Sequence, residues 1–390
     1  MREDNLFIIS STERIQHADK HYNAAAFVVL YYEEKVEFYK DYLIRIPKDI
    51  DVYIISSKEA ILDIFDDRFK KLKKNNRGRD ISGLLVAAKP YIFRYEYICF
   101  IHDKKEKTDA IWEYTREWEQ MIWESLLASG SYIVNLLYTM DSRSLEYMGV
   151  MLPFYSGLNR FPTDGYEDNV EGVRVLSQKI GIEYEEDDPP ITFATCFWAK
   201  TDMLKKLYSI DWKYEDFPDP AVNIDGDLNH SVERIFKYLL KDRGKDEAIC
   251  ISDRYMAYHY TQVHSGMQFM WEQLKKVGVH SISELMLFPK ISKALRAFSE
   301  RYRYIYIYGA GNRAASVFNF SALAGIRIDG FTVTTLSENQ KEYLGLPVIE
   351  YGKEISSESG IIIGVGLKQQ KEVISIIKNG GKQDYLLLEF

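Results

Sequence analysis

The sequence has little cysteine, no long apolar run and no low-complexity segment. Its three cysteines, Cys99, Cys196 and Cys250, are odd in number, far apart and without metal-binding spacing, so they form no disulfide framework. Each lies in an apolar run, and we expect three small buried residues in a reducing cytoplasm. No apolar stretch approaches the roughly twenty residues that a membrane-spanning helix needs.

Positive charge is also in short supply. The formal net charge of -8 argues against a general nucleic-acid binder, because phosphate backbones recruit basic proteins. The first ten residues, MREDNLFIIS, lack the cationic start and apolar core of a secretory signal. We therefore expect a cytoplasmic protein that could lie against the inner face of a membrane without crossing it.

Secondary-structure signals alternate over the first hundred residues. Apolar runs rich in β-branched and aromatic residues predict strands at 27–32, 52–55 and 97–101. Segments with helical periodicity lie between them, at 33–46 and 57–72. Such alternation is typical of a parallel, doubly wound sheet, so the sequence predicts an α/β fold with a Rossmann-like sheet.

The pattern continues and then starts again near the carboxyl end. Further helices are expected at 108–128, 225–240 and 254–300, and further strands at 192–200 and 248–252. Apolar runs at 304–308, 328–333, 361–365 and 385–388 predict a second sheet. We therefore expect a nucleotide-sugar-binding domain over 1–250, a helical linker over 251–300 and a small Rossmann-like domain over 301–390.

The turn GAGNRA in the second domain is similar to a dinucleotide-binding fingerprint, with Ala314 as its third small residue. A site for NAD would also need an acid at the end of the next strand, to hold the ribose hydroxyls. That strand ends in Thr334 and Thr335, whereas Asp329 lies near its start. No NAD is therefore expected. An anion site at the helix amino terminus and an interaction module both stay open.

Two segments should meet at the carboxyl edge of the first sheet, where open α/β sheets bind ligands. One is the basic turn NRGRD, which offers Asn76, Gly78, Arg79 and Asp80. The other is the loop after strand 97–101, which offers His102, Asp103, Lys104 and Lys105. Cations and an acid at one edge suit a diphosphate-bearing donor and a metal such as Mg²⁺ or Mn²⁺, with Asp103 as the metal ligand.

Each of these residues also has an ordinary structural interpretation. Asp103 could be a turn residue, and His102 could simply pack at the end of its strand. Asp80 could cap the helix that is expected to begin at Ile81. Lys104 and its neighbour could belong to a solvated basic loop.

A third cluster, DGDLNHSVER, begins at residue 225. It offers four candidates for the base that removes a proton from an acceptor hydroxyl, Asp225, Asp227, His230 and Glu233. The last two lie three residues apart and therefore share a helix face. Acids at a helix start also suit the helix dipole, so part of the cluster needs no functional explanation.

Taken together and in this order, five segments resemble the rhamnan synthesis protein F family of bacterial polysaccharide glycosyltransferases. They are NRGRD (76–80), YICFIHDKK (97–105), GVMLP (149–153), ATCFWAK (194–200) and DGDLNHSVERIF (225–236). The resemblance implies an A-type glycosyltransferase fold with a mixed sheet. It also implies a nucleotide-sugar donor such as dTDP-rhamnose, and as acceptor a growing lipid-linked glycan of the cell wall, capsule or lipopolysaccharide.

The resemblance also implies roles for single residues. Asp103 stands where A-type enzymes carry an Asp-x-Asp metal motif, but the partner positions hold Ile101 and Lys105. A metal or the two lysines could therefore neutralise the diphosphate. Phe197 and Trp198 would line the acceptor side, and the helix over 225–234 would supply the base of an inverting enzyme.

The sequence thus favours a glycosyltransferase of polysaccharide synthesis, with a second domain of unassigned chemistry. Two rival hypotheses stay open. One is a non-catalytic assembly protein that keeps a degenerate transferase fold. The other is an NAD(P)-dependent oxidoreductase that acts through the second domain.

Overall fold

The computed structural model divides the chain into two compact units, Met1–Gln262 (unit 1) and Val263–Phe390 (unit 2). The boundary falls within helix α9 (Asp253–Lys276). No helix in the described part of the chain is both long and apolar enough to cross a membrane. The structure describes residues 5–15, 20–104, 112–151, 169–219, 226–276, 282–338, 341–353, 355–380 and 383–388.

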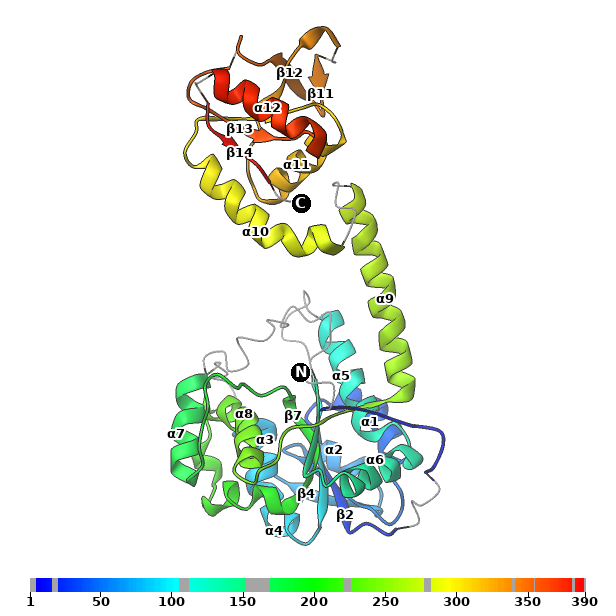
Figure 1. Ribbon diagram of the computed structural model, residues 1–390. Helices are drawn as coiled ribbons and strands as arrows, with labels where there is room; N and C mark the ends of the chain where they lie inside the picture. Colours follow the sequence, from blue (N-terminus) through cyan, green and yellow to red (C-terminus); the bar gives the residue numbers. More distant parts are fainter. Residues whose placement is uncertain are drawn as a thin grey trace. The chain divides into compact units, whose positions relative to one another are not determined.

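A sheet flanked by helices forms the centre of unit 1 (Figure 1). It has eight strands in the order β1-β8-β6-β7-β5-β2-β3-β4. All neighbouring strands are parallel except β7, which runs antiparallel to both β5 and β6. The predicted α/β fold with a mixed sheet is confirmed. The strands are β1 Leu6–Ile9, β2 Ala24–Val29, β3 Asp51–Ser56, β4 Phe69–Lys73, β5 Tyr97–His102, β6 Tyr147–Val150, β7 Phe193–Lys200 and β8 Ile249–Ser252.

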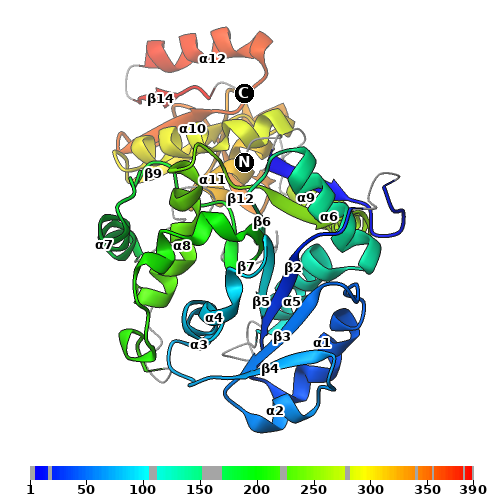
Figure 2. The ribbon, with the colours of Figure 1, turned by 90° about the horizontal axis from the view of Figure 1, so that it is seen from below.

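Helices cover both faces of this sheet (Figure 2). One face carries α1 Val36–Leu43, α2 Glu59–Asp63, α5 Trp112–Leu127 and α6 Gly130–Ser142. The other carries α3 Arg79–Ser82, the π-helix η3 Gly83–Ala87, α4 Lys89–Ile92, α7 Val170–Ile180 and α8 Leu228–Lys241. Short 3₁₀ helices are η2 Glu33–Lys35, η6 Thr201–Leu204, η7 Leu207–Ser209 and η8 Tyr214–Asp216.

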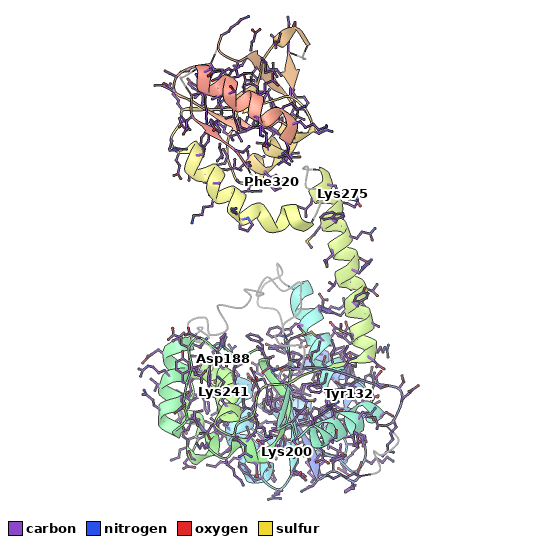
Figure 3. All side chains as sticks on the ribbon, viewed as in Figure 1. Tyr132, Asp188, Lys200, Lys241, Lys275 and Phe320 are labelled. Atoms are coloured by element: carbon purple, nitrogen blue, oxygen red, sulfur yellow. The ribbon has the colours of Figure 1, made fainter. Side chains whose placement is uncertain are left out.

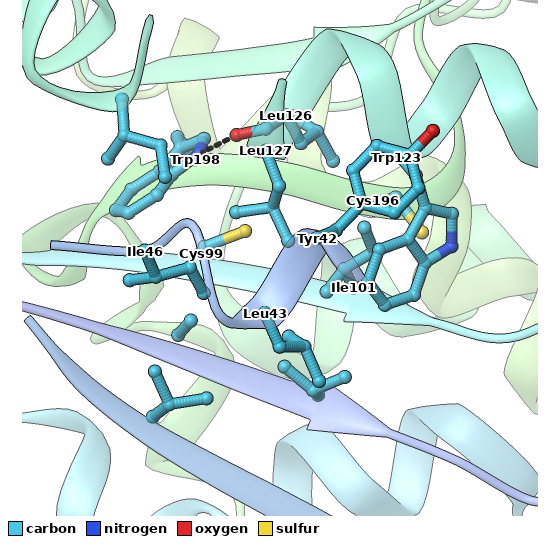
Figure 4. Close-up of a cluster of buried hydrophobic side chains, with 14 of the residues drawn as sticks. Tyr42, Leu43, Ile46, Cys99, Ile101, Trp123, Leu126, Leu127, Cys196 and Trp198 are labelled. Carbon is cyan, nitrogen blue, oxygen red and sulfur yellow. Dashed lines mark hydrogen bonds between the residues drawn. The ribbon is translucent and has the colours of Figure 1, made fainter. Parts of the chain in front are cut away.

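Because helices cover both faces, the central strands are apolar on both sides. All six residues of β5 are buried, as expected for a continuous apolar run in the middle of a parallel sheet. Figure 4 shows the core on the face of α5, where the Trp198 Nε1 donates to the Leu126 carbonyl oxygen over 3.0 Å. The three cysteines are free and buried, as predicted.

The predicted helix over 57–72 is wrong in its second half. Helix α2 ends at Asp63, and Phe69–Lys73 forms β4, which pairs with β3 along one side only. An edge strand with lysines along its open side resists pairing with other chains, and its charge hides the strand pattern. Strand β2 begins earlier than predicted, because the buried alanines from Ala24 onward have little strand signal of their own.

A six-stranded sheet forms unit 2, in the order β11-β12-β10-β9-β13-β14. The turn after β9 has the predicted form: Gly309 has φ 114°, and Gly311 precedes α11, whose Phe320 is buried (Figure 3). Asp329 precedes β10, and its carboxylate accepts the Ile305 N–H over 2.9 Å. The elements are α10 Ile282–Ser299, β9 Tyr304–Tyr308, α11 Asn312–Leu323, β10 Gly330–Val333, η9 Leu336–Glu338, β11 Glu342–Tyr343, β12 Leu346–Glu350, β13 Ser359–Ile363, α12 Leu367–Gly380 and β14 Tyr385–Leu386.

Gly83 allows the helix after the NRGRD turn to lie directly against the sheet. A Cβ atom at this position would lie 2.6 Å from Cγ2 of Val29 in β2, and a β-branched side chain has few alternative rotamers. The π-helix that starts here is a form often found beside functional sites.

We expect Gly83→Ala to lower the free energy of unfolding of unit 1 by about 1–3 kcal/mol, because overpacking outweighs the gain in helix propensity. Urea denaturation followed by tryptophan fluorescence measures the change. Gly311→Ala in unit 2, where a Cβ has no heavy atom within 4 Å, should leave the unfolding of unit 1 unchanged. An unchanged unfolding midpoint for Gly83→Ala would show that the close contact carries no cost.

Candidate functional site

The candidate site lies where the strand order reverses. The chain passes from β2 outward through β3 and β4, and then returns to place β5 on the other side of β2. Asp103, just after β5, joins the two sides, because its Oδ2 accepts the N–H groups of Tyr31 at 2.6 Å and Tyr32 at 2.8 Å. Burial raises the pKa of Asp103 to about 6, although these two N–H groups lower it. This reversal point is where open α/β sheets bind ligands.

The NRGRD turn is fixed by its contacts with a distant segment. Gly78 has φ 70°, and a Cβ there would lie 2.6 Å from Cγ of Phe217. Arg77 Nε donates to the Phe217 carbonyl oxygen over 2.6 Å. Arg79, which begins α3, also has a positive φ of 45°. Positive φ at a non-glycine residue costs free energy and is concentrated at functional sites.

Asp80 brings the two predicted segments together. Helix α3 begins at Arg79 with Gly78 as its N-cap, so the alternative of Asp80 as the N-cap is wrong. Its carboxylate Oδ2 lies instead 3.5 Å from Nε2 of His102. The turn after β4 and the end of β5 therefore share one acid and one imidazole.

His102 is held in a setting that favours the doubly protonated ring. Its Nδ1 lies 2.8 Å from the Asp103 carbonyl oxygen, and its Nε2 lies 2.7 Å from the Ala194 carbonyl oxygen. A carbonyl only accepts hydrogen bonds, so both ring nitrogens must donate. Burial lowers the pKa of His102, but the nearby Cys196 sulfur and Asp80 carboxylate raise it, and the result is about 10. The site therefore contains a buried imidazolium.

The start of β7 is a strained bulge that the imidazolium helps to hold. Ala194 and Thr195 have φ values of 79° and 49°, and the pairing with β6 shifts between Gly149 and Val150. The Ala194 carbonyl accepts from His102, and its N–H donates to Glu233 Oε1 of α8 over 2.5 Å. Because non-glycine residues rarely adopt positive φ, two in succession need such external support.

A second buried acid fixes the residues just before the bulge. Glu247 accepts the N–H groups of Ile191 at 2.9 Å and Thr192 at 3.2 Å, and it also accepts the Thr192 hydroxyl. Burial raises the pKa of Glu247 to about 7, against the lowering effect of these bonds. Two carboxylates and one imidazole thus determine the path of residues 191–195.

Helix α8 presents an acid–imidazole pair at its amino terminus. Asp227 is the N-cap: its Oδ1 accepts the N–H of Asn229 at 2.8 Å and of His230 at 3.2 Å. The same Oδ1 lies 3.0 Å from His230 Nδ1. Burial raises the pKa of Asp227, but the bonds from His230 outweigh it and lower the pKa. Lys241, farther along this helix, pairs with Asp188 at 2.5 Å. Figure 3 labels both residues.

Some predicted site residues lie elsewhere. The Lys104 Nζ lies 4.0 Å from the centroid of the Trp118 ring. The backbone N–H of Lys104 donates to the Glu119 carboxylate over 3.2 Å. Asn76 accepts from the Ser57 hydroxyl over 3.4 Å. Lys105 and Asp225 lie outside the described residues.

The expectation that Phe197 and Trp198 line the acceptor side is wrong. Both side chains are fully buried and belong to the cores on opposite faces of the sheet. The error arises because β7 is covered on both faces, so its aromatic residues fill the cores instead of forming a surface.

Lys74 is a candidate that the sequence prediction missed. It follows β4 directly and is only 6% exposed, and its N–H donates to the Ser56 carbonyl oxygen over 3.0 Å. Burial lowers the pKa of Lys74 to about 8, although Asp80 raises it. The signal in the sequence was a basic run at the end of a short strand, and the assignment of this segment to a helix concealed it.

The metal prediction is not supported by a ligand set. Among the described residues, no group of three or more His, Cys, Asp or Glu side chains could hold a metal ion. The carboxylate of Asp80 already pairs with the His102 imidazolium, which is a cation, at 3.5 Å. The role of Asp103 with Mg²⁺ or Mn²⁺ stays a prediction.

The contacts above, and not a cavity, define the site. A cavity of about 330 Å³ lies away from it, at the opposite edge of the sheet, where Tyr22 precedes β2 and Ile50 precedes β3. The segments 105–111, 152–168 and 220–225, which adjoin the ends of β5, β6 and the start of α8 in sequence, lie outside the described residues.

The comparison with protein families finds a match. The model of the family described as rhamnan synthesis protein F matches residues 2–245. The match spans the NRGRD turn, β5, β7 and all of α8, and it confirms the resemblance inferred from the five sequence segments. A comparison with curated proteins finds no match to the chain.

We expect the imidazole of His102 to titrate near pH 10. Its pKa is then higher in the native state than the 6.5 of an ordinary histidine, so its proton stabilises the native state below pH 6.5. That contribution is lost as the pH rises through 10. NMR titration of the seven histidine rings measures the pKa, with His102→Gln to assign the signal. A His102 signal that titrates at or below pH 6.5 would contradict the buried imidazolium.

Proposed function

The chain belongs to the rhamnan synthesis protein F family, which implies a part in rhamnan polysaccharide synthesis, and we propose that it is a glycosyltransferase with a nucleotide-sugar donor. The observation that carries the proposal is the 3.5 Å contact between Asp80 and His102. It joins the NRGRD turn to the end of β5 at the point where the strand order reverses. Nucleotides bind at this point of such sheets.

The buried imidazolium supplies the electrostatics that transfer needs. When the bond between the sugar and the diphosphate breaks, negative charge develops on the leaving diphosphate. A fixed cation in a site of low dielectric stabilises that charge more than a solvated one does. His102 is such a cation, because two carbonyl oxygens fix its ring before any ligand binds. The donor we propose is dTDP-rhamnose.

Helix α8 offers the base. Asp227 Oδ1 faces His230 Nδ1 at 3.0 Å, so a proton on Nδ1 leaves the lone pair of Nε2 to accept the proton of the acceptor hydroxyl. The acceptor oxygen then attacks the sugar carbon as the diphosphate leaves from the opposite side, which inverts the configuration. Glu233 already holds the N–H of Ala194, which suits a positioning role better than that of a base.

The proposed acceptor is a lipid-linked glycan, which the enzyme would meet at a membrane surface as a peripheral protein. An assay of donor turnover distinguishes this enzyme from the rival hypothesis, a non-catalytic assembly protein.

We expect the purified protein to release dTDP from dTDP-rhamnose in the presence of a lipid-linked acceptor, measured with and without Mg²⁺ or Mn²⁺ and beside UDP-sugars. His102→Gln should lower kcat/KM by roughly 10²-fold, because it removes the cation at the leaving group. Asp80→Asn should also lower kcat/KM, because it removes the carboxylate that favours the charged form of His102 and joins the two segments. The control is Asp211→Asn, an exposed acid that pairs with Lys89. A folded wild-type protein that turns over no donor would support the assembly protein instead.

The base assignment predicts a contrast between two residues of α8. His230→Gln should lower kcat by about 10²–10⁴-fold with little effect on KM, the range typical of a lost general base. Glu233→Gln keeps an oxygen that accepts the Ala194 N–H and should retain most of the activity, whereas Glu233→Ala should lose both activity and thermal stability. If Glu233→Gln is as inactive as His230→Gln, the base is Glu233.

A further inference from the structure

Lys74, which directly follows β4, differs from two lysines of that strand. Lys70 pairs with Asp51 at 2.5 Å and Lys73 pairs with Glu59 at 2.6 Å, both at the surface. Lys74 is buried to 6% exposure, and no ion pair within 4.0 Å or hydrogen bond holds its ammonium among the described residues. Its backbone is fixed, because the N–H donates to Ser56 at the end of β3.

A buried ammonium group without a close partner is costly, because it loses water and gains little in exchange. The lowered pKa of about 8 reflects this cost, which Asp80 offsets only in part. Asp80 is the one charged group, among the described residues, that acts on Lys74. Lys74 as a whole is only 6% exposed, so its ammonium meets little water. Lys74 therefore has the properties of a cation that binds an anionic ligand.

We propose that Lys74 binds the diphosphate of the donor, an inference that rests on the proposed function. The position of Lys74 favours a diphosphate over a neutral sugar as its ligand. Lys74 and His102 lie on two neighbouring loops, and both interact electrostatically with the carboxylate of Asp80. Lys74 and His102 carry two positive charges but share the one negative charge of Asp80. A bound diphosphate would supply the negative charge that is missing. In this role Lys74 is a binding residue for the part of the donor that leaves.

Calorimetric titration with dTDP and UDP, and with the nucleosides thymidine and uridine, tests the proposal. Lys74→Met should weaken diphosphate binding by about 10–100-fold, the range for one charge-assisted hydrogen bond, and leave nucleoside binding unchanged. Lys73→Met is the matched control and should bind both ligands as the wild type does. Lys74→Arg should restore much of the diphosphate affinity.

Proton uptake gives a second readout that a structural role would not produce. At pH 8.5 a large share of Lys74 is neutral in the free protein, and an anion beside it raises its pKa. Diphosphate binding should therefore take up a fraction of a proton, measured from binding enthalpies in buffers of different ionisation enthalpy. The uptake should vanish in Lys74→Met. His102, with a pKa of about 10, is already charged at this pH.

The outcomes separate the two proposals. Lys74→Met should have a melting temperature equal to or above that of the wild type, since it removes a buried charge, so lost binding cannot be ascribed to misfolding. Unchanged diphosphate affinity in this variant would overturn the role of Lys74 and leave the proposed function standing. Equal weakening of nucleoside binding would place Lys74 at the nucleoside and also overturn the inference. A wild-type protein that binds no nucleotide would overturn both.

Discussion

The imidazole of His102 joins three parts of unit 1 that are far apart in sequence. Through its two ring nitrogens it holds the carbonyl at the end of β5 and the strained carbonyl at the start of β7, and it faces the carboxylate of Asp80. If the ring were neutral, one of these two hydrogen bonds would be lost, because one nitrogen would then present a lone pair to a carbonyl oxygen. The link between the end of β5 and the start of β7 therefore depends on one bound proton.

The site is assembled from groups that are unfavourable on their own. Two residues of the β7 bulge and Arg79 of the NRGRD turn have positive φ without being glycine, and His102, Lys74 and Asp103 are charged groups under the surface. Folding tolerates this because the cores on both faces of the sheet are large and fully packed. Such an arrangement is preorganised: its cations are in place before a charged ligand arrives, which is the condition for strong electrostatic stabilisation.

Sequence patterns predicted the elements whose signal is local. The apolar run of β5 and the turn at Gly78 were both identified, because burial on two faces and a need for positive φ leave clear traces. The β7 bulge left none, since alanine and threonine are not residues that signal a left-handed backbone. Lys74 was missed because an edge strand of lysines resembles a solvated helix, and only the fold shows which lysine turns inward. Phe197 and Trp198 were misplaced because strong aromatic residues mark a buried strand as readily as a surface.

Strand β7 runs against its neighbours, so its beginning, and not its end, lies at the ligand edge. In a wholly parallel sheet, variation in the loops that follow the strands changes ligand preference. Here the connection that leads into β7 lies at that edge, while the residues after Lys200 emerge at the far edge. Related chains could thus diversify in the partner they recognise by altering residues 183–190 alone, with the anchoring carboxylates of Glu233 and Glu247 left in place.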